Sequence, residues 1–339
     1  LLFSSGTVNR LGRVDQGNTV TDFEDEEIAR KVSISSALCH LEWKKVKLNI
    51  IDTPGYGAFI ADAKAALRVV DGALVVVDGV SGVEVQTEEA WGYAEGFDLP
   101  RLLVVNKLDR ENASYARALD SITRAFGRQA VSVQIPIGAE KSFAGVVDLV
   151  ANKAFLYEKD ESGGHKIQDV PSDLAGEVKE ARDRLMEMVA EVDDALMEKF
   201  FESGSLSQED LARGLARGMK QRRLYPVLCA SALLNIGAHP LLDTLVACLP
   251  HPGERAPYKG ENPRDHAPAE RHGKADEPCS AFVFKTIADP YSGKISLFRV
   301  YSGVIKSDST VYNVSRDAQE RFGAIVILQG KESQSVTEV

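Results

Sequence analysis

Three short polar segments, each following a strongly apolar run, carry residue types that could bind a nucleotide. They are Asp52-Thr53-Pro54-Gly55 after the run 46–51, Asn106-Lys107-Leu108-Asp109 after the run 99–105, and Ser231-Ala232-Leu233 after the run 225–229. An open α/β sheet binds its ligand in loops at the carboxyl ends of its strands. In this order the segments predict a guanine-nucleotide site, although no Gly-x-x-x-x-Gly-Lys-Ser/Thr phosphate loop precedes them.

The choice of guanine rests on Asp109. Guanine presents a ring N–H beside an exocyclic amine, and one carboxylate accepts hydrogen bonds from both. Adenine lacks this donor pair, so a buried carboxylate facing it would stay unpaired at a cost of ~1–3 kcal/mol. We expect Asn106 to hold the loops together, Lys107 to lie along the base, and backbone N–H groups around Ser231 and Ala232 to donate to the keto oxygen. Taken alone, Asn-Lys-x-Asp could also be a surface turn.

Asp52 and Gly55 suit the phosphate end of such a site. Asp52 is predicted to hold Mg²⁺ through water, as hard oxygen ligands do, and Gly55 would let its N–H approach a γ-phosphate without a Cβ in the way. The following helix could then move when that phosphate leaves. Alternatively, this segment is a plain turn with a capping aspartate. Ser33 is the predicted hydroxyl ligand of Mg²⁺, or else an ordinary strand residue.

The elements expected around these segments alternate between strand and helix. Strands are predicted over 46–51, 73–77, 99–105 and 225–229, and helices over 58–70, 84–96 and 114–126. This alternation is typical of a doubly wound, mostly parallel α/β layer. Residues 7–36, which are polar, acidic and turn-rich, are predicted to be a mobile loop.

Residues 140–222 exceed what this layer needs and are predicted to form an inserted α+β subdomain. Short strands are expected in 146–157 and 165–170. Apolar residues recur every three or four positions from 174 to 200, which predicts one long helix closed by Gly204. Ser207 with Asp210 predicts the cap of a further helix through Met219.

The last third of the chain changes character. Residues 251–278 are rich in proline and charge and are predicted to be a linker. Strands over 281–287, 294–303 and 310–314, with turns at 289–293 and 306–309, then predict a partial antiparallel β-barrel over 279–339. The α/β layer with its insert would precede this linker, over residues 1–250.

The composition limits the possible partners and compartments. The 339 residues are 44% hydrophobic and 27% charged, which is typical of a globular protein with two or more domains. The net charge of −10 excludes a global basic field for nucleic acid or anionic membranes. Four scattered cysteines predict reduced thiols in a cytoplasmic protein, and no apolar run is long enough to predict a membrane span.

Taken together, the motifs resemble translation elongation factor G. Further stretches share the resemblance with the three nucleotide segments. They are Pro136-Ile137-Gly138 with Gly145-Val146-Val147-Asp148, the pair Leu249-Pro250, and the specific run 284–294 that continues through 299–303. The resemblance implies a P-loop-type GTPase domain, with its first strand and phosphate loop upstream of Leu1, followed by the translation-factor domain II. It also implies a monomer that binds GTP/GDP and Mg²⁺, has no membrane partner, and acts on ribosomal RNA and proteins during translocation or recycling.

Three positions depart from the usual family pattern. The family's histidine that positions the attacking water is Tyr56 here, and a phenol, with an unperturbed pKa near ~10, is a poor substitute at neutral pH. Lys31 and Ser33 replace the glycine and threonine of Arg-Gly-Ile-Thr, and Ala58 replaces an aspartate. These departures favour the elongation factor G-like paralogue found in some bacteria.

Alternative functions remain open at this stage. One is a ribosomal protection protein, and another is a ribosome factor that binds guanine nucleotides but hydrolyses them slowly or not at all. The chain lacks an initiating Met and a phosphate loop, so we expect a fragment that is inactive by itself, or the product of a non-functional gene fragment.

Overall fold

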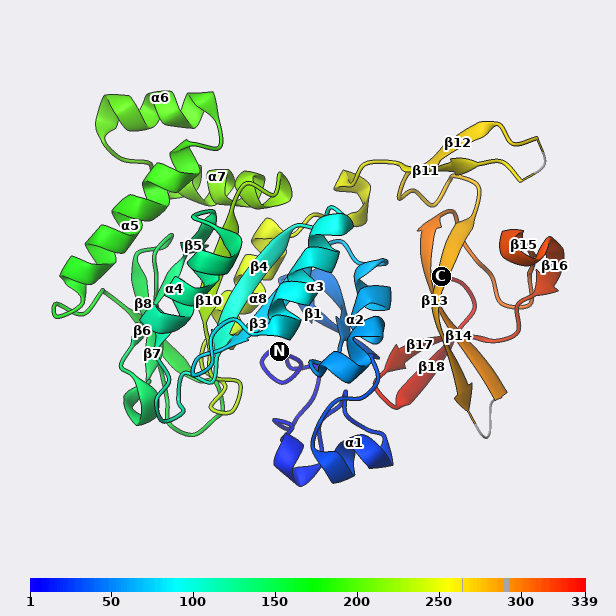
Figure 1. Cartoon of the computed structure of the whole chain (residues 1–339), viewed down its shortest axis with the longest axis horizontal. Coiled ribbons are helices and arrows are strands. Elements are labelled where there is room, and N and C mark those ends of the chain that lie inside the picture. The colour runs from blue at the N-terminus through cyan, green and yellow to red at the C-terminus, as the bar shows by residue number, and fades with distance from the viewer. Residues whose placement is uncertain (264, 290–292) are drawn as a thin grey trace. The chain divides into compact units, whose positions relative to one another are not determined.

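The structure is a computed structural model that describes residues 1–263, 265–289 and 293–339 (Figure 1). It divides into two compact units. Unit 1 comprises Leu1–Arg13, Leu41–Leu48 and Gly72–Leu249, and unit 2 comprises Val14–His40, Asn49–Asp71 and Pro250–Val339. Each unit is described by itself.

The described residues form eight α-helices and eighteen strands. The helices are α1 (Asp25–Arg30), α2 (Ile60–Leu67), α3 (Val85–Gly96), α4 (Tyr115–Phe126), α5 (Ala175–Ala190), α6 (Asp194–Ser203), α7 (Gln208–Lys220) and α8 (Ala238–Cys248). The first ten strands are β1 (Ala37–Trp43), β2 (Val46–Asp52), β3 (Ala73–Asp78), β4 (Arg101–Asn106), β5 (Ala130–Ser132), β6 (Gln134–Ile137), β7 (Gly145–Asp148), β8 (Lys153–Tyr157), β9 (His165–Gln168) and β10 (Tyr225–Cys229). The remaining strands are β11 (Tyr258–Glu261), β12 (Pro268–Arg271), β13 (Ser280–Asp289), β14 (Gly293–Ser302), β15 (Thr310–Asn313), β16 (Ala318–Arg321), β17 (Ile325–Gln329) and β18 (Glu332–Val336).

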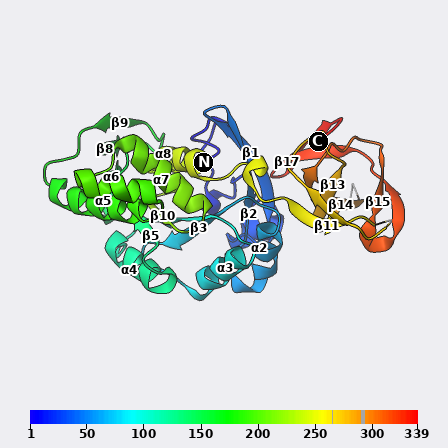
Figure 2. The same cartoon turned by 90° about the horizontal axis from the view of Figure 1, so that it is seen from above.

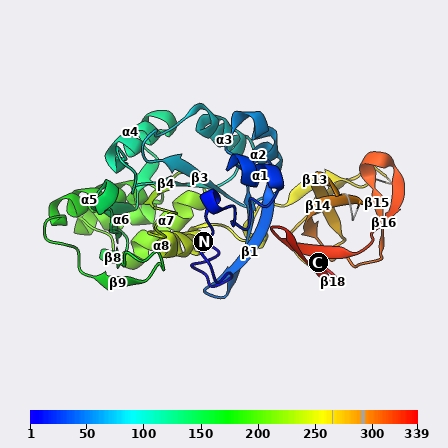
Figure 3. The same ribbon diagram turned by 90° about the horizontal axis from the view of Figure 1, so that it is seen from below.

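A four-stranded parallel sheet in the order β3-β4-β10-β5 forms the centre of unit 1. Asp78 lies opposite Asn106, and Cys229 lies opposite Val105, so β3, β4 and β10 end at the same edge. Figures 2 and 3 show α3 and α4 on one face of this sheet and α7 and α8 on the other. The predicted doubly wound layer is therefore confirmed, while β1 and β2 form a separate two-stranded sheet.

The core of unit 1 contains a buried arginine that the sequence pattern did not predict. Arg101 opens β4 with only 1% of its surface exposed. Its guanidinium lies 4.2 Å from the ring centre of Trp91 and 4.8 Å from that of Tyr225, and it donates to the Tyr225 hydroxyl at 3.0 Å. A planar, weakly hydrated guanidinium tolerates such stacking between aromatic faces.

The inserted region combines the antiparallel sheet β6-β7-β8-β9 with α5, α6 and α7. The prediction of one helix from 174 to 200 is wrong, because α5 ends at Ala190 and α6 begins at Asp194. Asp193 caps α6 by accepting a hydrogen bond from the Ala195 N–H at 2.9 Å, and a capping carboxylate starts a new helix without interrupting the apolar spacing. The predicted cap at Ser207 is confirmed, since its hydroxyl accepts the Asp210 N–H at 3.1 Å.

Unit 2 contains four antiparallel strand pairs from the last third of the chain: β11–β12, β13–β14, β15–β16 and β17–β18. Within the described residues these pairs do not close into a barrel. Strands β11 and β12 fall inside the segment expected to be a linker, where four-residue strands are too short to show a period. Residues 290–292 of the predicted turn lie outside the described residues.

The segment 7–36 is more structured than predicted. It contains α1, and Glu27 in this helix is only 1% exposed. Short polar helices of this kind lack an apolar stripe, so periodicity does not reveal them. Among the described residues, none of the helices is both long and apolar enough to cross a bilayer.

The space around two helical glycines differs, so replacing each by alanine should change the stability of the protein in opposite directions. A Cβ at Gly214 would overlap Val189 Cγ1 and lie 2.7 Å from Leu196 Cδ1, whereas a Cβ at Gly92 in α3 would meet nothing within 4 Å. We expect Gly214→Ala to lower the free energy of unfolding by ~1–3 kcal/mol through overpacking. Gly92→Ala should raise it by ~0.5–1 kcal/mol through helix propensity. Urea denaturation of both variants checks this, and a stabilised Gly214→Ala protein would contradict the packing.

Candidate nucleotide-binding site

Two of the predicted nucleotide loops meet at the ends of β4 and β10 in unit 1. The side-chain oxygen Asn106 Oδ1 accepts a hydrogen bond from the Ala232 N–H at 2.9 Å. The Leu108 N–H donates to Ala230 O at 3.3 Å, and the Leu108 side chain is buried in the core of unit 1. The parallel alignment of the two strands therefore brings together segments about 125 residues apart and lets Asn106 bridge them.

Asp109 presents an unsatisfied carboxylate oxygen beside these loops. Its Oδ1 is buried and has no hydrogen-bond partner among the described residues. A buried carboxylate oxygen without a donor costs free energy until a donor reaches it. A base edge with two adjacent N–H groups, as in guanine, would supply that donor, so the residues present fit a guanine ring.

Lys107 is held in place by a neighbouring strand. Its Nζ lies 2.8 Å from Oδ2 of Asp78, the last residue of β3, and its backbone adopts a left-handed φ of 62°. Partial burial alone would raise the pKa of Asp78, but the Lys107 ammonium and the Val80 N–H outweigh it and hold that pKa below its usual range. The ammonium is thus anchored, which directs the aliphatic stem of Lys107.

The loop after β10 is tightly closed by its own hydrogen bonds. Ser231, which is fully buried, exchanges two backbone hydrogen bonds with Ile236 at 3.0 Å, and its hydroxyl accepts the Leu234 N–H at 3.1 Å. The N–H groups of Ser231 and Ala232 are therefore both engaged within the protein. A keto oxygen would have to bind a neighbouring N–H or displace one of these bonds, while Leu233 is half exposed beside them.

The predicted phosphate and metal residues lie in unit 2. Asp52 ends β2, and its carboxylate receives a hydrogen bond from Thr21. The Ser33 hydroxyl donates to Asp22 Oδ1 at 2.7 Å. The two predicted metal residues are thus each tied to the adjacent pair Thr21 and Asp22, which the sequence analysis did not identify because the segment around them has no recognisable period or motif.

The surroundings of Asp52 make its negative charge unfavourable in the isolated chain. Crowding of the carboxylate by protein atoms raises the pKa of Asp52 above its usual range, although the residue as a whole is exposed at the end of β2. The Asp22 and Glu27 carboxylates add to the increase, and the Thr21 hydroxyl opposes it. A divalent cation would reverse this penalty by supplying the missing positive charge.

The donor set around Ser33 and Asp52 fits Mg²⁺. Hydroxyl and carboxylate oxygens are the ligands that this hard cation prefers, and Mg²⁺ commonly binds through one or two protein groups, water and substrate phosphates. In the described part of the chain, no group of three or more His, Cys, Asp or Glu side chains could hold a metal ion. Ser33 and Asp52 would therefore share the ion with a nucleotide, and the ion would neutralise phosphate charge there.

The segment after Asp52 leaves room for a ligand at Gly55. A Cβ at Gly55 would meet no atom within 4 Å, so no protein contact explains the glycine. Pro54 is buried and holds the segment against the protein, whereas the side chain of Tyr56 is 61% exposed at the start of the short helical turn Gly57–Phe59. The segment thus combines a buried proline with an exposed Gly55 and an exposed Tyr56.

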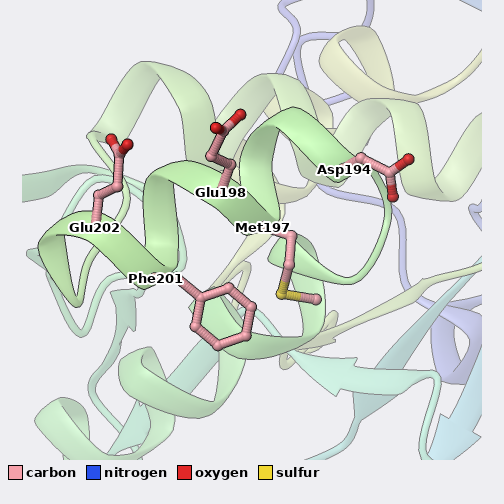
Figure 4. Close-up of a pocket in the computed structure, with 5 residues that line it drawn as sticks. All are labelled: Asp194, Met197, Glu198, Phe201 and Glu202. Carbon is pink, nitrogen blue, oxygen red and sulfur yellow. The ribbon is translucent and has the colours of Figure 1, made fainter.

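A surface hollow elsewhere in unit 1 does not suit a nucleotide. It is lined only by α6, through Asp194, Met197, Glu198, Phe201 and Glu202 (Figure 4). Met197 and Phe201 lie next to each other on one face of the helix, and the three carboxylates around them would repel phosphate groups.

Comparison with known proteins identifies the family. Residues 1–251 match the elongation factor Tu GTP binding domain. The chain belongs to that family. Residues 278–339 match elongation factor G domain 2, so the chain carries two domain types of translational GTPases. A crystal structure of a protein from Thermus thermophilus is similar over 100% of this chain, with 30% sequence identity and a TM-score of 0.85. The match covers 48% of that protein, so this chain spans about half its length.

The raised pKa of Asp52 predicts how stability depends on pH without metal. The folded state holds a proton on Asp52 at pH values where the unfolded chain has already lost it, so the free energy of unfolding falls as pH rises from about 4 through the folded pKa. Asp52→Asn removes this penalty and should be more stable than the wild type at neutral pH in EDTA. Urea denaturation across this pH range measures the difference. A less stable Asp52→Asn protein in EDTA would contradict the prediction, because it would show that groups of the folded protein already stabilise the negative charge of Asp52.

Proposed function

We propose that this chain forms the nucleotide-binding part of a ribosome-associated translational GTPase of the elongation factor G type. The observation that carries the proposal is the buried, unpartnered Oδ1 of Asp109, beside two loops that Asn106 holds together. The match to an elongation factor Tu GTP binding domain followed by elongation factor G domain 2 supports it. In the full-length protein, GTP hydrolysis would be coupled to translocation or recycling on the ribosome.

The proposed division of labour separates the residues that would bind the base from those that would bind the phosphates and the metal. Asp109 would accept the two guanine donors, Lys107 would cover the base, and the loop at Ser231–Leu233 would close on the keto oxygen. Asp52 and Ser33 would position Mg²⁺, which draws electron density from the phosphates when bound. Gly55 would donate its backbone N–H to the terminal phosphate, and Thr53 and Pro54 would hold that backbone in place.

The proposed domains follow the sequence pattern. Residues 1–250 would be the GTPase domain with its insert at 140–222, residues 251–278 a connection, and residues 279–339 the start of domain II. The family matches over 1–251 and 278–339 support these limits. Residues 251–278 contain the short strands β11 and β12, so the connection has structure of its own.

A second candidate is a ribosome factor that binds GTP without hydrolysing it efficiently. The specific observation in its favour is Tyr56, which stands where the resembled family carries a water-positioning histidine and whose side chain is 61% exposed. A neutral phenol accepts a proton from water poorly at pH 7. In that case nucleotide binding would control when the protein associates with the ribosome, and GTP would not be hydrolysed rapidly. Ribosomal protection is a third outcome, which activity on stalled ribosomes would reveal.

Exchanging the carboxylate of Asp109 for an amide should change base preference. Asp109→Asn would face the guanine N–H groups with one of its own donors, so we expect the affinity of the full-length protein for GDP to fall at least ~100-fold. Xanthosine diphosphate, which has a carbonyl in place of the exocyclic amine, should bind this variant more tightly than it binds the wild type. Titration calorimetry measures both affinities. Asp120→Asn, at an exposed position of α4, is the matched control and should keep the wild-type affinities.

The role of Tyr56 is tested by GTP hydrolysis of the full-length protein with and without ribosomes, beside a Tyr56→His variant. Strong stimulation of the wild type by ribosomes is the expected result for a working translational GTPase. The opposite pattern would favour the non-hydrolysing factor: ribosomes do not stimulate the wild type, and Tyr56→His hydrolyses GTP about tenfold faster or more. The reason is that an imidazole accepts protons near neutral pH.

A further inference from the structure

Lys285 of β13 reaches two segments of unit 2 that flank the proposed metal side of the site. Its Nζ lies 2.7 Å from Oδ2 of Asp62 in α2, the helix that follows Gly55. The same ammonium donates to Ser35 Oγ, and to Ser36 O at 3.3 Å and Ser36 Oγ at 3.2 Å. A single cation therefore bonds the helix after Gly55 and the segment that follows Ser33.

Asp62 completes a closed network with these groups. Its Oδ2 also accepts the Ser36 N–H at 2.7 Å and the Ser36 hydroxyl at 3.2 Å. Partial burial alone would raise the pKa of Asp62, but the bonds from Lys285 and Ser36 outweigh it and keep that pKa below its usual range. The side chain of Lys285 is only 13% exposed, so its charge has little access to water and depends on these partners.

A second buried carboxylate holds the same segment from its other side. Glu27, which is 1% exposed, accepts the N–H groups of Ile34 at 2.9 Å and Ser35 at 3.0 Å through Oε1. The three consecutive N–H groups after Ser33 are thus all bound by carboxylates, two by Glu27 and one by Asp62. The backbone that carries the Ser33 hydroxyl is therefore positioned by these two side chains.

We propose that Lys285 is a positioning residue for the Mg²⁺ and γ-phosphate side of the site, and that it joins residues 33–36 and α2 into one element anchored on β13. The proposal rests on the proposed function, because it assumes that Ser33 and Gly55 face the terminal phosphate. If residues 33–36 or α2 shift when that phosphate is lost, the Asp62–Ser36 and Asp62–Lys285 hydrogen bonds are both distorted. The antiparallel domain would thereby respond to the state of the nucleotide through a single ammonium group.

Arg299 of β14 provides a matched control on the same strand pair. Its guanidinium binds Asp71 at 2.8 and 2.9 Å and donates to Val69 O at 2.6 Å, just after the end of α2. It is similarly sheltered, with 17% of its side chain exposed, and none of these partners lies in residues 33–36. Arg299→Met therefore removes one sheltered cation from the same domain without touching the Ser36 network.

The first measurement is hydrogen–deuterium exchange of the chain without nucleotide. We expect Lys285→Met to speed exchange at least about tenfold at residues 34–36 and in the first turn of α2, because both lose one partner. Arg299→Met should leave residues 34–36 unchanged. Adding Lys285→Met to Asp62→Asn should have less effect than the sum of the single changes, since the groups share one network. Unchanged exchange at 34–36 in Lys285→Met, or strictly additive effects, would overturn the proposal.

The second measurement is nucleotide affinity of the full-length protein. Lys285→Met should weaken binding of a non-hydrolysable GTP analogue about tenfold and binding of GDP much less. Lys285→Arg keeps the positive charge and should therefore retain part of the affinity for the GTP analogue that Lys285→Met loses. Equal weakening for both nucleotides, or no weakening for either, would refute the role toward the γ-phosphate. If the wild type binds neither nucleotide, the proposed function fails, and the exchange measurement still decides whether Lys285 joins the two segments.

Discussion

Parallel pairing of β4 with β10 is the constraint on which the proposed base site depends. The register that places Cys229 opposite Val105 brings the ends of two strands from distant parts of the chain to the same edge. Only then can Asn106 accept the Ala232 N–H and the Leu108 N–H donate to Ala230 O. The apolar residues of both strands secure this register because they are buried on both faces, as in other parallel sheets.

Carboxylates organise the polar parts of both units, and they differ in how far the protein's own donors compensate their charge. Glu27, Asp62 and Asp78 each receive several donors from their own unit, and the last two have lowered pKa values as a result. Asp52 and Asp109 are less well compensated: the pKa of Asp52 is raised by burial despite hydrogen bonds from Thr21 and Thr53, and Oδ1 of Asp109 has no donor among the described residues. Under-compensated carboxylates in a stable fold are the positions where an external cation or donor would bind most favourably.

The secondary structure was predictable where one periodic pattern filled an entire element. The apolar runs at 73–77 and 99–105 appear in the structure as β3 and β4, and the amphipathic pattern at 114–126 appears as α4. The helix expected over 84–96 also appears, as α3, although its apolar residues do not gather on one face. The break between α5 and α6 escaped prediction because the apolar spacing continues across Asp193, whose capping bond depends on its side-chain conformation. Helix α1 escaped because its buried group is a glutamate rather than an apolar side chain.

The sequence by itself determined the parallel sheet layer, the order of the three nucleotide segments and the type of base they would select, since those follow from residue type and spacing. Tertiary structure alone decided which groups meet: Thr21 and Asp22 beside Asp52 and Ser33, the residues proposed to hold the metal, Lys107 against Asp78, and Lys285 against Asp62 and Ser36. The reason is physical. Periodicity reports which face of an element is buried, whereas polar contacts between distant segments depend on the packing that brings those faces together.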